Sequence, residues 1–380
     1  MRIAQLSTPF IQVPPEGYGG TELVVSLITE ELVARGYDVT LFASGDSKTR
    51  AKLVAEFAEA IHYDKMESLF SPQAAKLFWM HSLPSLMHIS KLIDSIDSFD
   101  IIHNHFHYLP LFFTSQTTVP FVHTYHGDFS VAEESVIERM VLEKFSHQNW
   151  VAISESQKKN CQLGLRFVSV IHHGIQLQQF SYEENPENHL VWLGRITEKK
   201  GTQDAIEVAK KVGMHLTVAG VVHERDTAFF QQKIEPQVDN DTIRYVANLN
   251  LTQKVDLLKR AKVLLYPIHW EEPFGMVMIE AMACGTPVIA YNHGSVPEIV
   301  KDGETGFIIN ASETNTQGDF SIKAVGFEGL CEAVKRITSM SSQEYAQMRK
   351  ACRKRVEDYF TVERMVDSYD ALYKKILSTS

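Results

Sequence analysis

Short hydrophobic runs recur along the whole chain and alternate with longer segments whose apolar residues repeat at helical spacing. The first run, residues 3–6, is followed by a glycine-containing loop and then by residues 20–36, where leucine, isoleucine and valine recur every three or four positions. This alternation is typical of βαβ units, in which parallel strands pair and helices cover the sheet. The pattern therefore predicts an α/β fold.

The predicted strands fall into two series. The first series comprises residues 3–6, 39–42, 100–102, 121–124, 151–153 and 168–171. The second series comprises residues 190–193, 215–219, 242–246, 263–266 and 288–290. A polar stretch without periodicity, residues 176–188, lies between them and predicts a linker.

The length of 380 residues agrees with this division, because a chain of that size exceeds what one hydrophobic core usually serves. We expect an N-terminal Rossmann-like domain over 1–175, the linker over 176–188 and a C-terminal Rossmann-like domain over 189–356. A C-terminal helix is expected over 357–380. Ligands of such doubly wound domains bind at the carboxyl ends of the strands.

Net charge, hydropathy and cysteine content limit the kinds of partner and the cellular compartment that we expect. The formal net charge is -10, which argues against a nucleic-acid partner, because such a protein presents a basic groove to phosphates. No apolar run is long enough for a transmembrane segment, and no export signal is evident at the N-terminus. The four cysteines lack paired short spacings. We therefore expect a cytoplasmic protein.

The most informative stretch is residues 271–290, EEPFGMVMIEAMACGTPVIA. It predicts a helix over about 274–284, ended by the following glycine. The free amides at Gly275, Met276 and Val277 would then point out of the helix N-terminus, where an anion such as a diphosphate is stabilised.

Glu272 and Glu280 flank this helix start. Eight positions at 1.5 Å per residue place them about 10 to 12 Å apart, which is too far for the carboxylate pair of most glycosidases. We interpret them as two separate acceptors for hydroxyls of one extended ligand. The alternative is structural: a glutamate favoured by the helix dipole and a second one that is solvated.

The same stretch resembles the donor-site signature of the retaining glycosyltransferases of family 4, whose two-domain fold is called GT-B. Further matches follow in order at residues 19–22, His126, 173–175, 193–195 and 200–201. The resemblance implies two Rossmann-like domains facing across a cleft, with the last helix crossing back to the first domain.

The resemblance also implies roles for individual residues. Arg195 and Lys200 would neutralise the diphosphate, Glu280 would hold the ribose hydroxyls, and Glu272 would hold the 3- or 4-hydroxyl of the sugar. The implied donor-binding set is Gly19, Gly20, Arg195, Lys200, Glu272, Phe274, Gly275, Met276, Val277 and Glu280. The implied catalytic set is His126, Glu272, Arg195 and Lys200.

Three of these positions belong to the first domain. Gly19 and Gly20 let the backbone approach a phosphate, although a plain tight turn before a helix is the alternative. Their pattern lacks GxGxxG, so no dinucleotide cofactor is expected. By the family pattern His126 would lie against the donor sugar, and Asp128 is a candidate on the acceptor side.

His103, His105 and His107 alternate, and on a strand they would share one face as metal ligands do. No cysteine or acidic residue follows at short range, so we interpret them as hydrogen-bonded wall residues. Neither a metal nor another cofactor is expected, because fixed cations can carry the diphosphate charge.

The sequence thus predicts a retaining glycosyltransferase that moves a hexose from a nucleoside diphosphate sugar, a UDP-sugar being favoured, to an acceptor hydroxyl. The alternatives are a nucleotide-sugar epimerase of the same fold and a non-catalytic nucleotide-sugar-binding protein. The acceptor is unknown. Acidic charge favours a soluble small molecule or glycan over a lipid.

Overall fold

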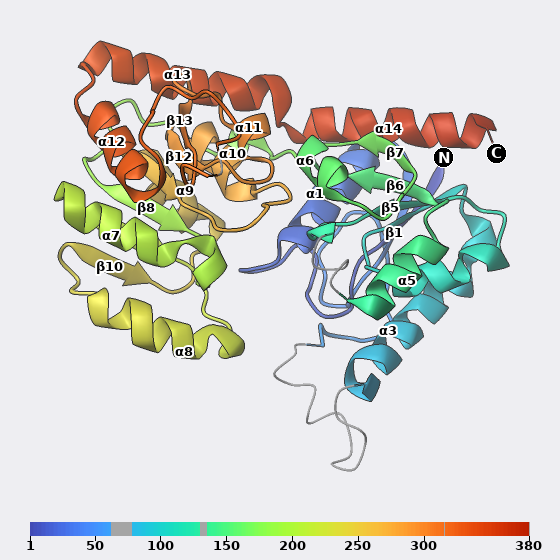
Figure 1. Ribbon diagram of the computed structural model, residues 1–380. Coiled ribbons are helices and arrows are strands. Elements are labelled where there is room, and N and C mark those ends of the chain that lie inside the picture. Colours follow the sequence, from blue (N-terminus) through green and yellow to red (C-terminus); the bar gives the residue numbers. More distant parts are fainter. Residues whose placement is uncertain (62–77, 130–134, 315, 380) are drawn as a thin grey trace. The chain divides into compact units, whose positions relative to one another are not determined.

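The computed structural model describes residues 1–61, 78–129, 135–314 and 316–379, and the chain forms two compact units (Figure 1). Unit 1 consists of Met1–His173 and Val362–Ser380, and unit 2 consists of Gly174–Thr361. Each unit is a parallel α/β domain, so the predicted fold class is confirmed. The boundaries differ slightly from the expected 175 and 357.

Unit 1 contains a seven-stranded sheet in the order β3-β2-β1-β4-β5-β6-β7, with every pair parallel. The strands are β1 (Arg2–Leu6), β2 (Asp38–Phe42), β3 (Lys52–Val54), β4 (Ile101–Asn104), β5 (Phe121–Thr124), β6 (Asn149–Ala152) and β7 (Phe167–Val170). The order reverses between β1 and β4, and this switch point is where doubly wound sheets bind ligands.

The helices of unit 1 cover this sheet (Figure 1). They are α1 (Gly20–Ala34), α3 (Phe78–Ile93), α5 (Val136–Lys144), α6 (Glu155–Asn160) and α14 (Val362–Thr379), with 3₁₀ turns at Ile96–Ser98 and Leu109–Gln116. The predicted closing helix is broken at Phe360, so α14 begins at Val362. It packs against α1 and buries Val366, Tyr369 and Tyr373.

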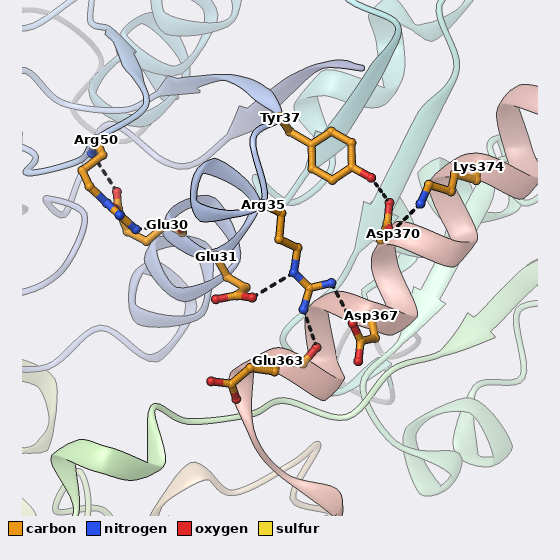
Figure 2. A network of polar contacts seen from close by, with 9 residues as sticks. All are labelled: Glu30, Glu31, Arg35, Tyr37, Arg50, Glu363, Asp367, Asp370 and Lys374. Carbon is orange, nitrogen blue, oxygen red and sulfur yellow. Dashed lines mark hydrogen bonds and ion pairs between the residues drawn. The ribbon is translucent and has the colours of Figure 1, made fainter.

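A polar network fixes α14 at the end of α1 (Figure 2). Arg35 donates to Asp367 at 2.7 Å and to the carbonyl of Glu363 at 3.0 Å. The Tyr37 hydroxyl donates to Asp370 at 2.5 Å. The last helix is therefore an integral part of unit 1, although it follows unit 2 in the chain.

Unit 2 contains a six-stranded parallel sheet in the order β10-β9-β8-β11-β12-β13, which is the Rossmann order. The strands are β8 (Leu190–Leu193), β9 (Leu216–Ala219), β10 (Ile243–Val246), β11 (Val263–Tyr266), β12 (Val288–Tyr291) and β13 (Gly306–Ile309). Here the order reverses between β8 and β11.

The helices of unit 2 pack on this sheet around one large apolar core. They are α7 (Thr202–Val212), α8 (Thr227–Phe229), α9 (Leu251–Arg260), α10 (Met276–Ala283), α11 (Val296–Ile299), α12 (Gly326–Thr338) and α13 (Ser342–Tyr359). Short 3₁₀ helices lie at Leu177–Gln179, Glu198–Lys200, Glu224–Asp226 and Glu235–Gln237, and a π-helical segment lies at Phe230–Ile234. Within the described residues, no helix combines the length and hydropathy needed to cross a membrane.

The segment predicted as a linker, 176–188, is held by two arginines of α13. Arg349 is fully buried and donates to the carbonyl of Glu183 at 2.7 Å, while Arg353 donates to the carbonyl of Phe180. Arg349 also donates to the carbonyls of Lys259 and Cys284, at 3.0 and 3.1 Å. The segment is thus an ordered part of unit 2.

Candidate active site

Three predicted site residues of unit 2 lie at its switch point. Arg195 lies just beyond β8, Lys200 ends the turn that follows, and Glu272 lies in the loop after β11. Strands β8 and β11 are neighbours in the sheet. Their carboxyl ends therefore bring two cations and a carboxylate to the same edge, as expected of a ligand site in this fold.

Glu272 is buried, and three donors converge on its Oε2 atom. Lys200 forms an ion pair with it, the Tyr266 hydroxyl donates at 2.5 Å, and the Trp270 indole donates at 3.1 Å. The Lys200 ammonium also lies 4.6 Å from the centroid of the Trp270 ring, a cation–π distance. Sequence reasoning missed Tyr266 and Trp270, because both read as apolar residues near a strand end.

The backbone of this loop is held by the turn after β12. The Ser295 amide donates to the carbonyl of Glu272 at 2.9 Å, and its hydroxyl donates to the carbonyl of Phe274 at 2.6 Å. Gly294 has φ +57, and a Cβ there would lie 2.2 Å from the Glu272 carbonyl oxygen. Only glycine permits this approach, which positions the Glu272 carboxylate.

Lys200 is placed by a second close approach. Gly201 has φ +69, and a Cβ there would lie 1.8 Å from the carbonyl oxygen of Pro267. The Trp192 indole donates to the Lys200 carbonyl at 3.1 Å. The turn after β8 therefore packs directly on the loop after β11, and this packing brings the ammonium to Glu272.

The helix that follows begins later than predicted. α10 starts at Met276, with Gly275 as its N-cap at φ 79. Phe274 is buried and lies before the helix, so the helix begins two residues after the expected start at about 274. The positive φ explains the shift, since a residue in the left-handed region cannot belong to the helix. The first-turn amides include those of Met276 and Val277.

Glu280 lies inside α10 and is also buried. Its Oε1 atom pairs with the Lys254 ammonium of α9 at 2.5 Å. Lys254 was missed because an isolated lysine on an amphipathic helix resembles a solvated residue. Each of the two predicted glutamates therefore pairs with its own lysine.

Arg195 has a weaker set of contacts. Its Nε atom lies 3.9 Å from Asp226 Oδ2, and it is a buried donor that makes no hydrogen bond to the described residues. Asp226 Oδ2 is likewise buried without a hydrogen-bond partner among the described residues. Burying such groups without partners costs free energy.

In unit 1, His126 follows β5 in a loop clamped by Gln157 of α6. The Gln157 amide donates to the carbonyls of Tyr125 and Gly127, at 2.9 and 2.6 Å. His126 Nε2 lies 2.9 Å from His105 Nδ1, and His126 Nδ1 lies 3.3 Å from His173 Nε2. Burial lowers the pKa of His126 to about 3, so its imidazole is neutral at neutral pH.

Two of the three alternating histidines, His103 and His105, are hydrogen-bonded through their rings. His103 contacts the hydroxyls of Thr124 and Tyr373 at 2.8 and 2.5 Å, and His105 Nε2 lies 3.1 Å from Gln5 Oε1. His107 is exposed. Among the residues that the structure describes, no group of histidine, cysteine and acidic side chains has a metal-binding arrangement. These contacts agree with wall residues.

The remaining predicted residues of unit 1 lie in two loops. Gly19 is the N-cap of α1, whose first turn begins at Gly20. The buried Glu22 carboxylate accepts from the Thr8 hydroxyl at 3.1 Å, and a Cβ on Gly19 would lie 3.1 Å from Glu22 Oε2. A carboxylate of the chain therefore lies beside this helix start. Asp128 is partly buried, two residues beyond His126.

Two Rossmann-like units, each with a parallel sheet, and two buried glutamates, Glu272 before α10 and Glu280 inside it, are typical of the GT-B class of glycosyltransferases. Comparison with known families gives the same answer. A model described as "Glycosyl transferases group 1" matches residues 175–321, and one described as "Glycosyltransferase Family 4" matches residues 18–179. The chain belongs to this family of glycosyltransferases.

Similar proteins include glycogen synthase of Mycobacterium tuberculosis (strain CDC 1551 / Oshkosh), 34% identical over 152 residues. This alignment covers 38% of the chain, and the chain spans only 36% of that relative's length. An uncharacterized glycosyltransferase of Methanocaldococcus jannaschii is 24% identical over 340 residues, covering 80% of the chain and 84% of the relative.

Solved structures share the fold. Sucrose-phosphate synthase from Thermosynechococcus elongatus superposes with a TM-score of 0.78 at 20% identity, covering 100% of both chains. Anabaena HepE, solved in complex with UDP and glucose, gives a TM-score of 0.75 at 16% identity, covering 99% of this chain and 100% of that one.

Proposed function

We propose that the protein transfers a hexose from a nucleoside diphosphate sugar, with a UDP-sugar as the first candidate, to an acceptor hydroxyl, with retention at C1 and without a metal. The observation that carries the proposal is the convergence of Arg195, Lys200, Glu272 and the α10 N-terminus at one switch point. The UDP complex of the similarly folded HepE supports the choice of donor.

The charge arrangement suits a leaving diphosphate. As the bond between C1 and oxygen breaks, negative charge grows on the diphosphate, and fixed cations and amide dipoles stabilise that charge. Arg195 supplies a buried donor without a hydrogen-bond partner among the described residues. Met276 and Val277 supply first-turn amides. This set performs the task that a metal ion has in other transferases.

Lys200 and Glu272 exchange partners in this scheme. In the structure, the ammonium and the carboxylate pair with each other. A sugar hydroxyl that donates to Glu272 replaces Lys200 as a donor to this carboxylate, while Tyr266 and Trp270 keep their hydrogen bonds to it. The Lys200 ammonium can then turn to the diphosphate. Donor binding therefore assembles the cation set, while the two aromatic residues keep the carboxylate in place.

Glu280 has the corresponding role for the nucleoside. Lys254 holds one carboxylate oxygen, so the other can accept from the vicinal ribose hydroxyls. In this proposal the reaction takes a front-face route, in which the departing phosphate deprotonates the acceptor, and this route retains the configuration at C1. The neutral imidazole of His126 positions the sugar and carries no charge. The buried thiols of Cys284, Cys331 and Cys352 support a reduced, cytoplasmic setting.

The test is turnover of UDP-, GDP- and ADP-hexoses by Arg195→Ala, Lys200→Ala and the double variant. Each charged hydrogen bond is worth about 1.5 to 3 kcal/mol, so each single change should lower kcat/KM by about tenfold to a hundredfold. The neighbouring, exposed Lys199→Ala is the matched control and should retain activity. Near-normal turnover of the double variant would overturn the assignment.

The same assay separates the alternatives. An epimerase would isomerise the donor with no acceptor present, and nuclear magnetic resonance of the sugar would reveal the product. A non-catalytic binding protein would show a thermal shift with a nucleotide sugar and no turnover. A transferase releases free nucleoside diphosphate only as an acceptor is consumed, apart from slow hydrolysis.

A further inference from the structure

A line of four hydrogen-bonding side chains runs through unit 1 and ends beyond His126. Gln5 on β1 contacts His105 at 3.1 Å, His105 contacts His126 at 2.9 Å, and His126 contacts His173 at 3.3 Å. The His126 ring is stacked between the other two imidazoles, with centroids 5.2 Å away on each side. Gln5 is fully buried.

The side-chain oxygen of Gln5 sets the direction of the hydrogen bonds along this line. Gln5 Oε1 only accepts, so His105 carries its proton on Nε2 and presents the Nδ1 lone pair. That lone pair requires the His126 proton on Nε2, which leaves His126 Nδ1 as an acceptor toward His173. Because burial keeps these imidazoles neutral, each ring has one donor and one acceptor.

The other end of the Gln5 amide is also occupied. Its Nε2 atom donates to the Tyr373 hydroxyl of α14 at 3.5 Å, and that hydroxyl lies 2.5 Å from His103 Nδ1. His103 in turn contacts the Thr124 hydroxyl through Nε2. If the Gln5 amide were reversed, the proton positions would have to change along both the His105 branch and the Tyr373–His103 branch. The last helix therefore belongs to the same hydrogen-bond network as Gln5.

We propose that Gln5 and His105 are positioning residues for His126, and that they fix its tautomer with the proton on Nε2 and an acceptor lone pair on Nδ1. This inference rests on the proposed function, in which His126 contacts the donor sugar. A hydroxyl of the sugar or of the acceptor then meets a lone pair at Nδ1, in competition with His173, rather than a second N–H.

The central experiment compares two substitutions of one residue. In His105→Asn the side-chain oxygen replaces Nδ1 as an acceptor for the His126 proton, whereas His105→Leu supplies no polar group. Both variants lose the contact with Gln5. We expect kcat of the leucine variant to fall about tenfold or more with little change in the dissociation constant of UDP, and the asparagine variant to stay within a few-fold of wild type.

The second readout is the tautomer itself, observed by ¹⁵N nuclear magnetic resonance of histidine-labelled protein. In the wild type and in His105→Asn, the His126 ring should be protonated at Nε2. In Gln5→Met and His105→Leu, it should become a mixture of tautomers. Thr29→Val is the control, since that buried hydroxyl makes no hydrogen bond to the described residues and lies outside the line.

The outcomes are distinct. A wild-type His126 protonated at Nδ1, or equal losses of kcat in the asparagine and leucine variants, would overturn the inference. If no nucleotide sugar supports turnover, the proposed function fails, while the tautomers still decide whether Gln5 and His105 orient His126. Thermal unfolding of each variant identifies a loss of activity that comes from misfolding.

Discussion

Acidification should unfold unit 1 well before the carboxylates that carry its surface charge are neutralised. Its interior holds several histidines whose pKa values are depressed by burial, to about 4 for His88 and to about 3 for His123 and His126. Burial likewise holds the pKa values of His103 and His105 well below the usual range. Each ring is therefore neutral in the native unit.

The direction in which pH changes the stability of unit 1 follows from proton uptake. Below about pH 6.5 the unfolded chain binds a proton on each histidine, whereas the native unit excludes it until its own lower pKa. The stabilisation is thus present above pH 6.5 and is lost as the pH falls. Counting His88, His123 and His126 alone, the loss is about 4 kcal/mol near pH 5.5 and about 8 kcal/mol near pH 4.5.

These losses are comparable with the entire stability of an ordinary domain, about 5 to 15 kcal/mol. Among the residues of unit 2 that the structure describes, there is no such set of histidines with depressed pKa values. Burial lowers the pKa values of His189 and His223, but the hydrogen bond to Asp204 raises the pKa of His269, so part of the effect cancels. We therefore expect unit 1 to be the acid-labile part of the chain.

The assay is urea unfolding at a series of pH values, with hydrogen-exchange mass spectrometry of peptides from β5 and β11 to separate the two units. His88→Gln should reduce the pH slope of unit 1 by about one proton. The exposed His147→Gln is the control and should leave the slope unchanged. A free energy of unfolding for unit 1 that stays constant between about pH 7 and pH 5.5 would refute the reasoning.

Two further predictions concern buried charges. Arg349→Met leaves the carbonyls of Glu183, Lys259 and Cys284 without their donor and should lower the free energy of unfolding by about 3 to 5 kcal/mol in urea titrations; a cost no greater than that of the exposed Lys350→Met would contradict this. Burial raises the pKa of Glu22, so its ionised form opposes folding at neutral pH. Glu22→Gln should accordingly raise Tm at pH 7, with the gain disappearing below about pH 4.5; a Tm gain independent of pH would exclude this explanation.

Strand positions were largely predictable because the sheets are parallel and buried, and their strands read as continuous apolar runs. The two missed strands lie at the far edges. β3 contains only Lys52–Val54, and β13, Gly306–Ile309, follows a polar turn and opens with a glycine. Edge strands pair on one side only, so their sequences carry a weaker signal.

The predicted linker shows a second kind of feature that the sequence alone does not reveal. Residues 176–188 have the composition of a solvated connection, yet they are tied to α13 through backbone carbonyls that accept from Arg349 and Arg353. Every residue has a carbonyl, so no sequence pattern distinguishes one that will bind a buried guanidinium. The two arginines gave no signal either, because arginine on a helix usually reads as a surface residue.

For the candidate site, the sequence supplied the charged residues but not their partners. Arg195, Lys200 and Glu272 stand in a recognisable order along the chain. Their environment depends on close approaches that only the folded chain shows, such as Gly201 against the Pro267 carbonyl. Tyr266 and Trp270 became visible as donors to Glu272 only once β11 and its loop were in place.

The tyrosines of α14 also have polar partners that the sequence does not reveal, and these partners bear on the acid lability of unit 1. Tyr369 and Tyr373 read as the apolar face of an amphipathic helix, and their rings are indeed buried. Their hydroxyls, however, contact Thr124 and His103. A polar interior of neutral imidazoles needs such partners, since a buried group without one costs about 1 to 3 kcal/mol. The imidazole of His105, which orients His126, therefore also makes the unit sensitive to acid. Both His105 variants should reduce the acid sensitivity, but only His105→Leu should also lower kcat strongly, because asparagine still accepts the His126 proton.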